Sequence, residues 1–202
     1  MTFAYGDAAD HAILNDLSFS VQEGEQVTLS GRTGAGKSTI FKLLLGLYEP
    51  QQGQVLIRGI PAGQILPAER RHVFGYVEQS FHMVPGTVKD QITLYDPSIG
   101  MDAVRKAAEM VGLADVIEQL EQGYDTPCAP ELFSQGQWQL LSIARATVAD
   151  PKLLLLDEIT ASMDAQTEKE VLEALQRSAA NRTVLSISHR IHAKMGRVIE
   201  IS

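Results

Sequence analysis

Residues 31–38 constrain this chain more than any other part of its sequence. They read GRTGAGKS, which fits the spacing G-x-x-x-x-G-K-[ST] without a break. Residues 25–30 have the pattern of a short strand, and residues 38–47 have the pattern of a leucine-rich helix. This strand–loop–helix order favours a phosphate-binding loop over a glycine turn that merely precedes a helix. The segment therefore predicts a site for the phosphates of a nucleoside triphosphate.

The residue types of the loop suit that chemistry. Its glycines let the backbone curl, so that N–H groups and the positive end of the following helix point at the phosphates. Lys37 supplies a mobile positive charge for the terminal phosphates, and the Ser38 hydroxyl is placed to bind Mg²⁺. The expected nucleotide contacts are Gly31, Thr33, Gly34, Ala35, Gly36, Lys37, Ser38 and Thr39.

A second motif, PKLLLLDE, occupies residues 151–158. Its leucines, bounded by proline and acids, predict a strand buried on both faces of a parallel sheet, and such sheets bind ligands at their carboxyl edge. We expect Asp157 to hold Mg²⁺, directly or through water. Glu158, which strand alternation turns the other way, is expected to polarise an attacking water. The alternative is that Asp157 and Glu158 form a solvated acidic turn. A phosphate loop, however, requires carboxylates that bind Mg²⁺ and activate water, so the two motifs together predict a P-loop NTPase.

A third motif, LFSQGQ at residues 132–137, precedes the helical pattern of residues 138–149. It resembles the LSGGQ signature of ATP-binding-cassette (ABC) ATPases, in the form with a leading Phe and a free third position. Alone the motif is weak, but its place ahead of the acidic pair, with one helix between them, makes the resemblance specific. In this family the signature of one copy caps ATP bound to another. The resemblance therefore implies that Ser134, Gly136 and Gln137 contact ATP.

The resemblance extends over nearly the whole chain. It implies that Tyr5 stacks on adenine, that Gln79 reaches the Mg²⁺ and reports to the transport domain, and that His189 holds the γ-phosphate. Residues 161–164 align with the D-loop, and residues 85–92 resemble the segment after the Q-loop of exporter-type members. Two plainer interpretations stay open, a frayed aromatic for Tyr5 and a satisfied core histidine for His189.

The fold implied is that of an α/β P-loop NTPase with a mostly parallel core sheet, an N-terminal antiparallel β element and an inserted helical lobe that ends in the signature. We expect one domain over residues 1–202, with a core lobe at 1–84 and 138–202 and a helical lobe at about 85–137. Periodicity predicts the separate elements. Strands are expected at residues 13–22, 25–30, 54–58, 73–77, 153–156, 183–188 and 197–201, and helices at 38–47, 88–94, 101–112, 114–123, 138–149 and 165–179.

The function implied is that of the ATP-binding and hydrolysing domain of an ABC transporter, in which two copies close head to tail over two ATP molecules. The expected catalytic residues are Lys37, Gln79, Glu158 as general base, and His189. The expected partners are a second nucleotide-binding domain and transmembrane domains fused to it in the native chain, at the cytoplasmic face of the membrane. Export is favoured over import by residues 85–92 and by the form of the signature.

Other functional classes fit less well. A DNA-repair or chromosome-organising ATPase of this superfamily would carry a long heptad-bearing insertion, a translation-type or regulatory member would carry two cassettes, and a small-molecule kinase would have no use for the signature. The formal net charge of −8 supplies no basic field for nucleic acid. The single cysteine, Cys128, precludes an internal disulfide, and no apolar run reaches the ~20 residues of a membrane helix. We therefore expect this chain to be soluble and intracellular.

Three features depart from the family pattern. Residues 126–131 (TPCAPE) are shorter and stiffer than the T-x-V-G-E-x-G stretch that exporters usually carry before the signature. Position 138, often Arg, is the only tryptophan. Because Trp138 lies off the apolar stripe of its helix, we expect it to be partly exposed until two copies close, the alternative being a ring packed in its own lobe. The chain ends soon after His189, which suggests a domain cut from a longer polypeptide or a compact variant.

Overall fold

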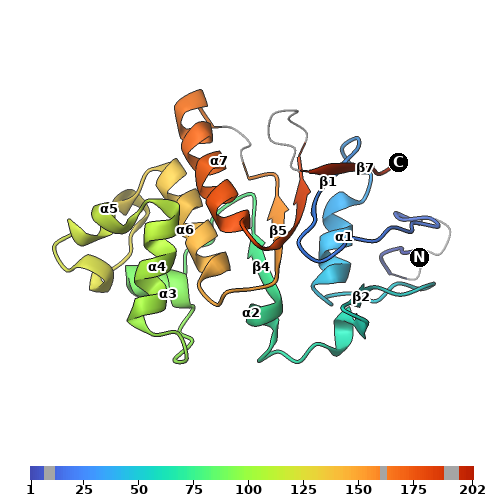
Figure 1. Ribbon diagram of the computed structural model, residues 1–202, viewed down its shortest axis with the longest axis horizontal. Helices are drawn as coiled ribbons and strands as arrows, with labels where there is room; N and C mark the ends of the chain where they lie inside the picture. The colour runs from blue at the N-terminus through green and yellow to red at the C-terminus, as the bar shows by residue number, and fades with distance from the viewer. Residues whose placement is uncertain (7–11, 160–162, 189–195) are drawn as a thin grey trace.

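A five-stranded sheet forms the centre of the structure, a computed structural model that describes residues 1–6, 12–159, 163–188 and 196–202 (Figure 1). The strand order is β4-β5-β6-β1-β7, and all of these neighbours pair in parallel. In Figure 1 the helices α3 to α5 lie on the left of the picture, whereas α1, β1, β7 and both termini lie on the right. The strands are β1 (Gln26–Ser30), β4 (Phe74–Val77), β5 (Leu153–Asp157), β6 (Thr183–Ile187) and β7 (Arg197–Glu200).

The predicted helices are present, most of them with small differences at their ends, but the helix expected at residues 114–123 ends at Glu118, five residues early. None of those in the described part of the chain is long and apolar enough to cross a membrane. The α-helices are α1 (Lys37–Leu44), α2 (Arg70–Val73), α3 (Val88–Thr93), α4 (Met101–Val111), α5 (Ala114–Glu118), α6 (Gln135–Thr147) and α7 (Ala165–Ala179). Short 3-10 turns cover Ala62–Gln64, Gly123–Asp125 and Pro130–Leu132.

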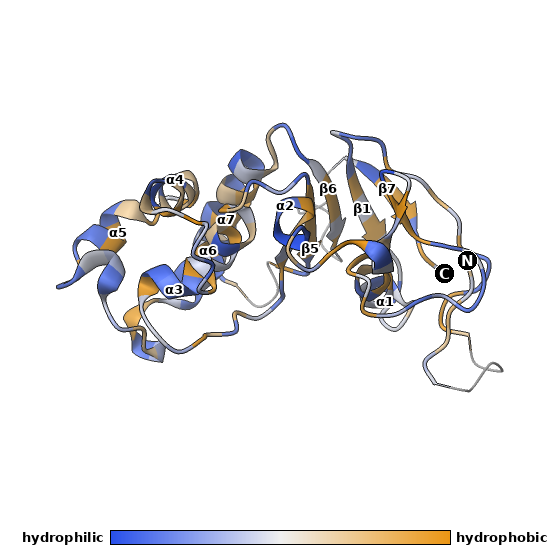
Figure 2. Ribbon diagram, turned by 90° about the horizontal axis from the view of Figure 1, so that it is seen from below, coloured by the Kyte–Doolittle hydropathy of each residue, from blue (hydrophilic) through white to orange (hydrophobic). Residues whose placement is uncertain are grey.

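The leucine-rich strand β5 lies inside the sheet, as predicted. Leu154, Leu155 and Leu156 are all buried, and the sheet strands carry apolar residues along their length (Figure 2). Its neighbours are β4 on one side, where Leu156 pairs with Val77, and β6 on the other. Because the sheet is parallel, the carboxyl ends of β1, β4, β5 and β6 meet at one edge. The phosphate loop, the segment with Gln79, and the acidic pair all begin at this edge.

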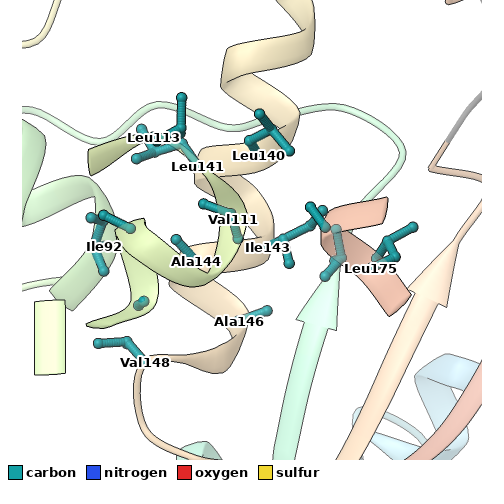
Figure 3. Close-up of a cluster of buried hydrophobic side chains, with 14 of the residues drawn as sticks. Ile92, Val111, Leu113, Leu140, Leu141, Ile143, Ala144, Ala146, Val148 and Leu175 are labelled. Carbon is teal, nitrogen blue, oxygen red and sulfur yellow. The ribbon is translucent and has the colours of Figure 1, made fainter. Parts of the chain in front are cut away.

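Helix α6 is anchored in a cluster of buried apolar side chains (Figure 3). It packs against α3, α4, α7 and strand β4. Leu141 and Ile143 are fully buried, and each such side chain stabilises the fold by roughly 1.5–3 kcal/mol. Neighbouring elements contribute Ile92 from α3, Val111 from α4 and Leu175 from α7. The helix that follows the signature is therefore held on several sides.

The first helix ends earlier than predicted, at Leu44 instead of residue 47. Gly46 adopts a positive φ of 65°, and the Leu47 N–H donates back to the Lys42 carbonyl. A left-handed glycine with this backward hydrogen bond is a common helix stop. The leucine-rich pattern extends beyond the glycine, which is why periodicity alone made the helix too long.

The prediction of a strand at residues 13–22 is wrong. The antiparallel pairing in this part of the chain consists of isolated bridges, Thr2 with Gln52 and Phe3 with Leu14, and of a short hairpin formed by β2 (Leu56–Ile57) and β3 (Ile60–Pro61). Residues 17–22 instead line an apolar cavity of about 920 Å³, together with residues 53–58. The alternation of apolar and polar residues at 13–22 therefore does not correspond to a strand, because no strand of the described structure pairs with this segment.

Candidate functional site

The phosphate loop joins β1 to α1 and is shaped by glycines in the left-handed region. The φ angles are 147° at Gly31, 85° at Gly34 and 85° at Gly36. At Gly31 a side chain also has no room, because a Cβ would lie 2.2 Å from the carbonyl oxygen of Ile201. The glycines are thus required by the backbone itself as well as by the expected ligand.

Lys37 is buried within this loop. It is 5% exposed, and its Nζ donates hydrogen bonds to the carbonyl oxygens of Gly31 and Arg32, both at 2.9 Å. These bonds hold the ammonium group across the loop, beside the N–H groups that we expect to bind phosphate. Of the other predicted contacts in this segment, Thr33 and Ser38 are exposed, and Ala35 and Thr39 are buried.

Tyr5 reaches α1 from the N-terminal segment. Its hydroxyl lies 3.2 Å from Oγ1 of Thr39, and its ring makes edge contacts with Phe3 and Tyr48 at centroid distances of 5.0 and 5.1 Å. The Nζ of Lys42 lies 5.4 Å from the centre of the same ring. Tyr5 is therefore held by several contacts and is not frayed. Sequence reasoning missed Tyr48 and Lys42, although Lys42 follows Thr39 by three residues on the same helix face.

Asp157 ends strand β5 and is half-buried. The Tyr76 hydroxyl donates to its Oδ2 at 3.2 Å. Burial is the main cause that raises the pKa of Asp157 above its usual value, and the charges of Glu158 and Glu78 add to this effect. The hydrogen bond from Tyr76 and the charge of Lys37 lower that pKa. Tyr76 was also missed, but its place on β4 beside Leu155 puts it on the same sheet face as Asp157.

Glu158 follows directly in an unusual backbone conformation. Its φ is 47°, in the left-handed region, and its N–H donates to the Ile187 carbonyl at 3.1 Å. Such a conformation costs of order 1–3 kcal/mol in a residue other than glycine. The strand pairing and this hydrogen bond hold the turn in place at the residue that we expect to act as general base.

The remaining predicted residues of the core are placed only in part. Gln79 is exposed and follows β4, the neighbour of the strand that carries Asp157. His189 and residues 161–162 of the expected D-loop lie outside the described residues. Asp164 is described and caps α7, where its Oδ1 accepts from the N–H groups of Gln166 and Thr167, both at 3.0 Å.

The signature begins helix α6 and forms a capping box. The Ser134 hydroxyl accepts from the N–H of Gln137 at 3.3 Å, and the Gln137 side chain accepts from the N–H of Ser134 at 2.9 Å. Gly136 is buried against Thr167, whose Cγ2 would lie 2.4 Å from an added Cβ. Ser134 itself is exposed. The start of α6 belongs to the helical side of the molecule, across β4 and β5 from α1 (Figure 1), so the signature is not brought to the phosphate loop of its own chain.

The residues that we expect to bind a metal carry oxygen donors. They are the Ser38 hydroxyl, the Asp157 carboxylate and the Gln79 amide, and Mg²⁺ prefers such ligands together with waters and phosphate oxygens. Within the described parts of the chain, no group of three or more His, Cys, Asp or Glu side chains could hold a metal ion. The donor set therefore fits an ion that nucleotide phosphates help to hold, and does not fit a metal cage made by the protein alone.

Comparison with known proteins agrees with this geometry. Residues 14–161 match the family model described as ABC transporter. The chain belongs to the ABC transporter family. Its sheet and loop accordingly form the α/β P-loop NTPase fold of this family, and the family is one of ATP-binding domains.

Two relatives of this ABC domain are named as ATP-binding proteins, and one of them is named for toxin translocation. The domain is 39% identical over 183 residues to the ABC transporter ATP-binding protein exp8 of Streptococcus pneumoniae, covering 90% of this chain and 31% of the relative. It is 40% identical over 182 residues to the toxin RTX-III translocation ATP-binding protein of Actinobacillus pleuropneumoniae, covering 89% of this chain and 26% of the relative.

A solved structure gives the same result. The structure of a bacterial Atm1-family ABC exporter with ATP bound superposes with a TM-score of 0.85 and 34% identity, covering all of this ABC domain and 36% of the exporter chain. The domain thus spans between about a quarter and a third of the proteins that it matches.

Proposed function

We propose that this ABC domain binds MgATP on its phosphate loop and hydrolyses it while the signature of a second copy, or of a related domain, covers the nucleotide. The observation that carries the proposal is the position of Lys37, whose Nζ is held by two carbonyls inside the phosphate loop. The acidic pair follows β5 at the same sheet edge. The signature lies across β4 and β5 from this loop, which favours its use by another copy.

Each residue has a distinct role in this proposal. The loop N–H groups and Lys37 bind the β- and γ-phosphates, and Tyr5 stacks on the base. Ser38, Asp157 and Gln79 would hold Mg²⁺, which would supply positive charge to neutralise the phosphates. Glu158 accepts the proton of the attacking water, and His189 orients the γ-phosphate.

The signature completes the site from the other copy. Ser134 and Gly136 present the start of α6 to the γ-phosphate, where the helix dipole favours negative charge. The capping box leaves the Ser134 side chain exposed at that start while Gln137 closes the backbone of the first turn. We propose that ATP holds the two copies together and that hydrolysis releases them.

The work performed is export across a membrane. This part of the proposal rests on the names of the relatives, which include toxin translocation proteins and an Atm1-family exporter. The partners are then a second nucleotide-binding domain and the transmembrane domains of the transporter, at the cytoplasmic face of the membrane. Residues 85–137 form the helical lobe that contacts them, and the core lobe comprises residues 1–84 and 138–202.

Enzyme kinetics and sizing of the 202-residue chain test the proposal. Because the site needs two copies, the ATPase rate per chain should rise with protein concentration. Glu158→Gln should bind MgATP normally, turn over about 10²–10⁴-fold more slowly and form a stable ATP-dependent dimer. Lys37→Ala, the matched control, should weaken nucleotide binding itself. A Glu158→Gln variant with near-normal ATPase activity would exclude the assigned base, and a rate independent of concentration would exclude the shared site.

A further inference from the structure

The segment that carries Gln79 is fastened to helix α6. Before this glutamine, the Glu78 carbonyl accepts a hydrogen bond from Nε2 of Gln139 at 3.1 Å. After it, the ring of Phe81 packs against the ring of Trp138, with centroids 4.8 Å apart and planes inclined by 30°. Gln79 thus lies between two points of contact with the same helix.

Arg145 reinforces the second of these points. Its guanidinium lies 4.1 Å from the centre of the Phe81 ring and donates to the His82 carbonyl at 2.8 Å. Burial lowers the pKa of Arg145 to about 10, so it stays charged at neutral pH. A cation over the face of an aromatic ring is attracted to it, so Arg145 holds the Phe81 ring in place.

The other ring of the pair is fixed to the signature. Trp138 follows Gln137 in the chain and is half-buried. Its Nε1 donates to the Pro130 carbonyl at 3.2 Å, and Phe133 meets it edge-on at 5.1 Å. A displacement of the Trp138 ring therefore also displaces the turn that carries Ser134.

We infer that Trp138 and Phe81 are positioning residues, whose ring contact sets the orientation of the signature according to the position of Gln79. The inference rests on the proposed function, because it assumes that Gln79 responds to bound MgATP. Two packed rings keep their contact only by moving together, so a shift at Gln79 reaches Ser134 through this pair. In the described part of the chain, the hydrogen bonds of the capping box do not reach the segment of Gln79. The ring pair therefore links the site for the chain's own nucleotide to the signature, which faces the nucleotide of the partner.

Kinetics of the full chain test this link. Trp138→Ala and Phe81→Ala should each lower kcat by about 3–10-fold, the range of an aromatic pair, with little change in MgATP affinity. The double variant should be no slower than either single variant, because both remove the same contact. Trp138→Phe should restore kcat to within about twofold, since a phenyl ring preserves the packing.

Leu120→Ala is the matched control. Leu120 is partly buried against the same apolar cluster, so its truncation should lower the free energy of unfolding while kcat stays unchanged. Effects of Trp138→Ala and Phe81→Ala that multiply in the double variant would overturn the inference. A loss of stability without a loss of kcat would overturn it as well, because the ring pair would then be merely structural.

Tryptophan emission gives a second measurement, since Trp138 is the only tryptophan. At protein concentrations where the chain is monomeric, MgATP should change the emission, and Gln79→Ala or Phe81→Ala should remove that change while a fluorescent ATP analogue still binds. Binding of the analogue with unchanged emission of the unmodified chain would overturn only this inference. Failure of the unmodified chain to bind the analogue would overturn the proposed function and the inference with it.

Discussion

The hydroxyl of Tyr76 donates a 3.2 Å hydrogen bond to Oδ2 of Asp157, so β4 supports the carboxylate that β5 presents. Burial, followed by the charges of Asp157 and Glu78, raises the pKa of Tyr76, which keeps the phenol protonated and able to donate at neutral pH. The same burial raises the pKa of Asp157. The hydrogen bond therefore favours the charged carboxylate that a metal requires.

Tyr76→Phe should shift the acid limb of the ATPase pH profile to higher pH. Without the phenol, Asp157 loses an interaction that lowers its pKa, so protons compete more effectively with Mg²⁺. The measurement is the Mg²⁺ concentration that gives half the maximal rate, determined at a series of pH values from neutral downward. As the pH is lowered, this concentration should begin to increase at a higher pH in the variant than in the unmodified chain. Superimposable profiles would show that the hydrogen bond does not tune the metal ligand.

Asp157→Asn should stabilise the nucleotide-free chain at neutral pH. The raised pKa of Asp157 means that its contribution to stability is lost as the pH rises through the folded-state pKa, so the charged form is unfavourable in the fold. Removing the charge should raise Tm, at about 2–4 °C per kcal/mol for a chain of this size. Calorimetry should also show that MgATP no longer raises Tm, and the Tm difference should shrink in acid. A lower Tm for the variant would contradict this account.

Gly31→Ala should destabilise the fold far more than Gly34→Ala. A methyl group at Gly31 would meet the Ile201 carbonyl at 2.2 Å, whereas nothing lies within 4 Å of a Cβ at Gly34. We expect a loss of about 2–4 kcal/mol for the first change and about 1 kcal/mol, from backbone strain, for the second. Urea unfolding without nucleotide separates the two. Equal losses would mean that backbone strain alone, and not contact with Ile201 just after β7, governs this position.

Ser134→Ala and Ser134→Asp should separate capping of α6 from binding of the partner's ATP. Alanine removes the cap seen between Ser134 and Gln137 and should cost about 1 kcal/mol of stability. Aspartate preserves the cap but places a negative charge where the partner's γ-phosphate is expected, so it should keep stability and lose the ATP-dependent dimer in the Glu158→Gln background. Sizing chromatography and thermal unfolding report the two effects. A normal dimer with aspartate would place the signature away from the nucleotide.

Local patterns predicted much of the fold and of the core site. The glycine spacing between a strand pattern and a helix pattern was enough to locate the phosphate loop and the strand before it. The run of four leucines was enough to predict a buried strand. Strands β1 and β5 were therefore predicted close to their observed bounds. The position of Asp157 and Glu158 was predictable because residues that follow a buried parallel strand lie at the carboxyl edge of the sheet. Apolar periodicity located the three helices α3, α4 and α5, although it extended the last of them to residue 123 and the helix ends at Glu118.

Contacts between distant residues were not predictable in this way. Residues 13–22 alternate like a strand, but a strand also needs a neighbour, which the sequence pattern does not reveal. The bonds from Tyr5 to Thr39 and from Tyr76 to Asp157 join residues far apart in the chain, and no local rule gives their register. Trp138 was expected to be partly exposed and is half-buried, yet its contact with Phe81 depends on how α6 lies against the end of β4.

The place of β1 in the sheet has a consequence for synthesis on the ribosome. This strand carries the phosphate loop, but its neighbours are β6 and β7, and the Ile201 N–H bonds to the Ser30 carbonyl. Thr28 and its partner Ser186 are 158 residues apart in the chain. When the phosphate loop has emerged from the ribosome, β6 and β7, the two strands that pair with β1, have not yet been synthesised. The chain should therefore acquire affinity for nucleotide late in synthesis, only when β6 and β7 have emerged to pair with β1.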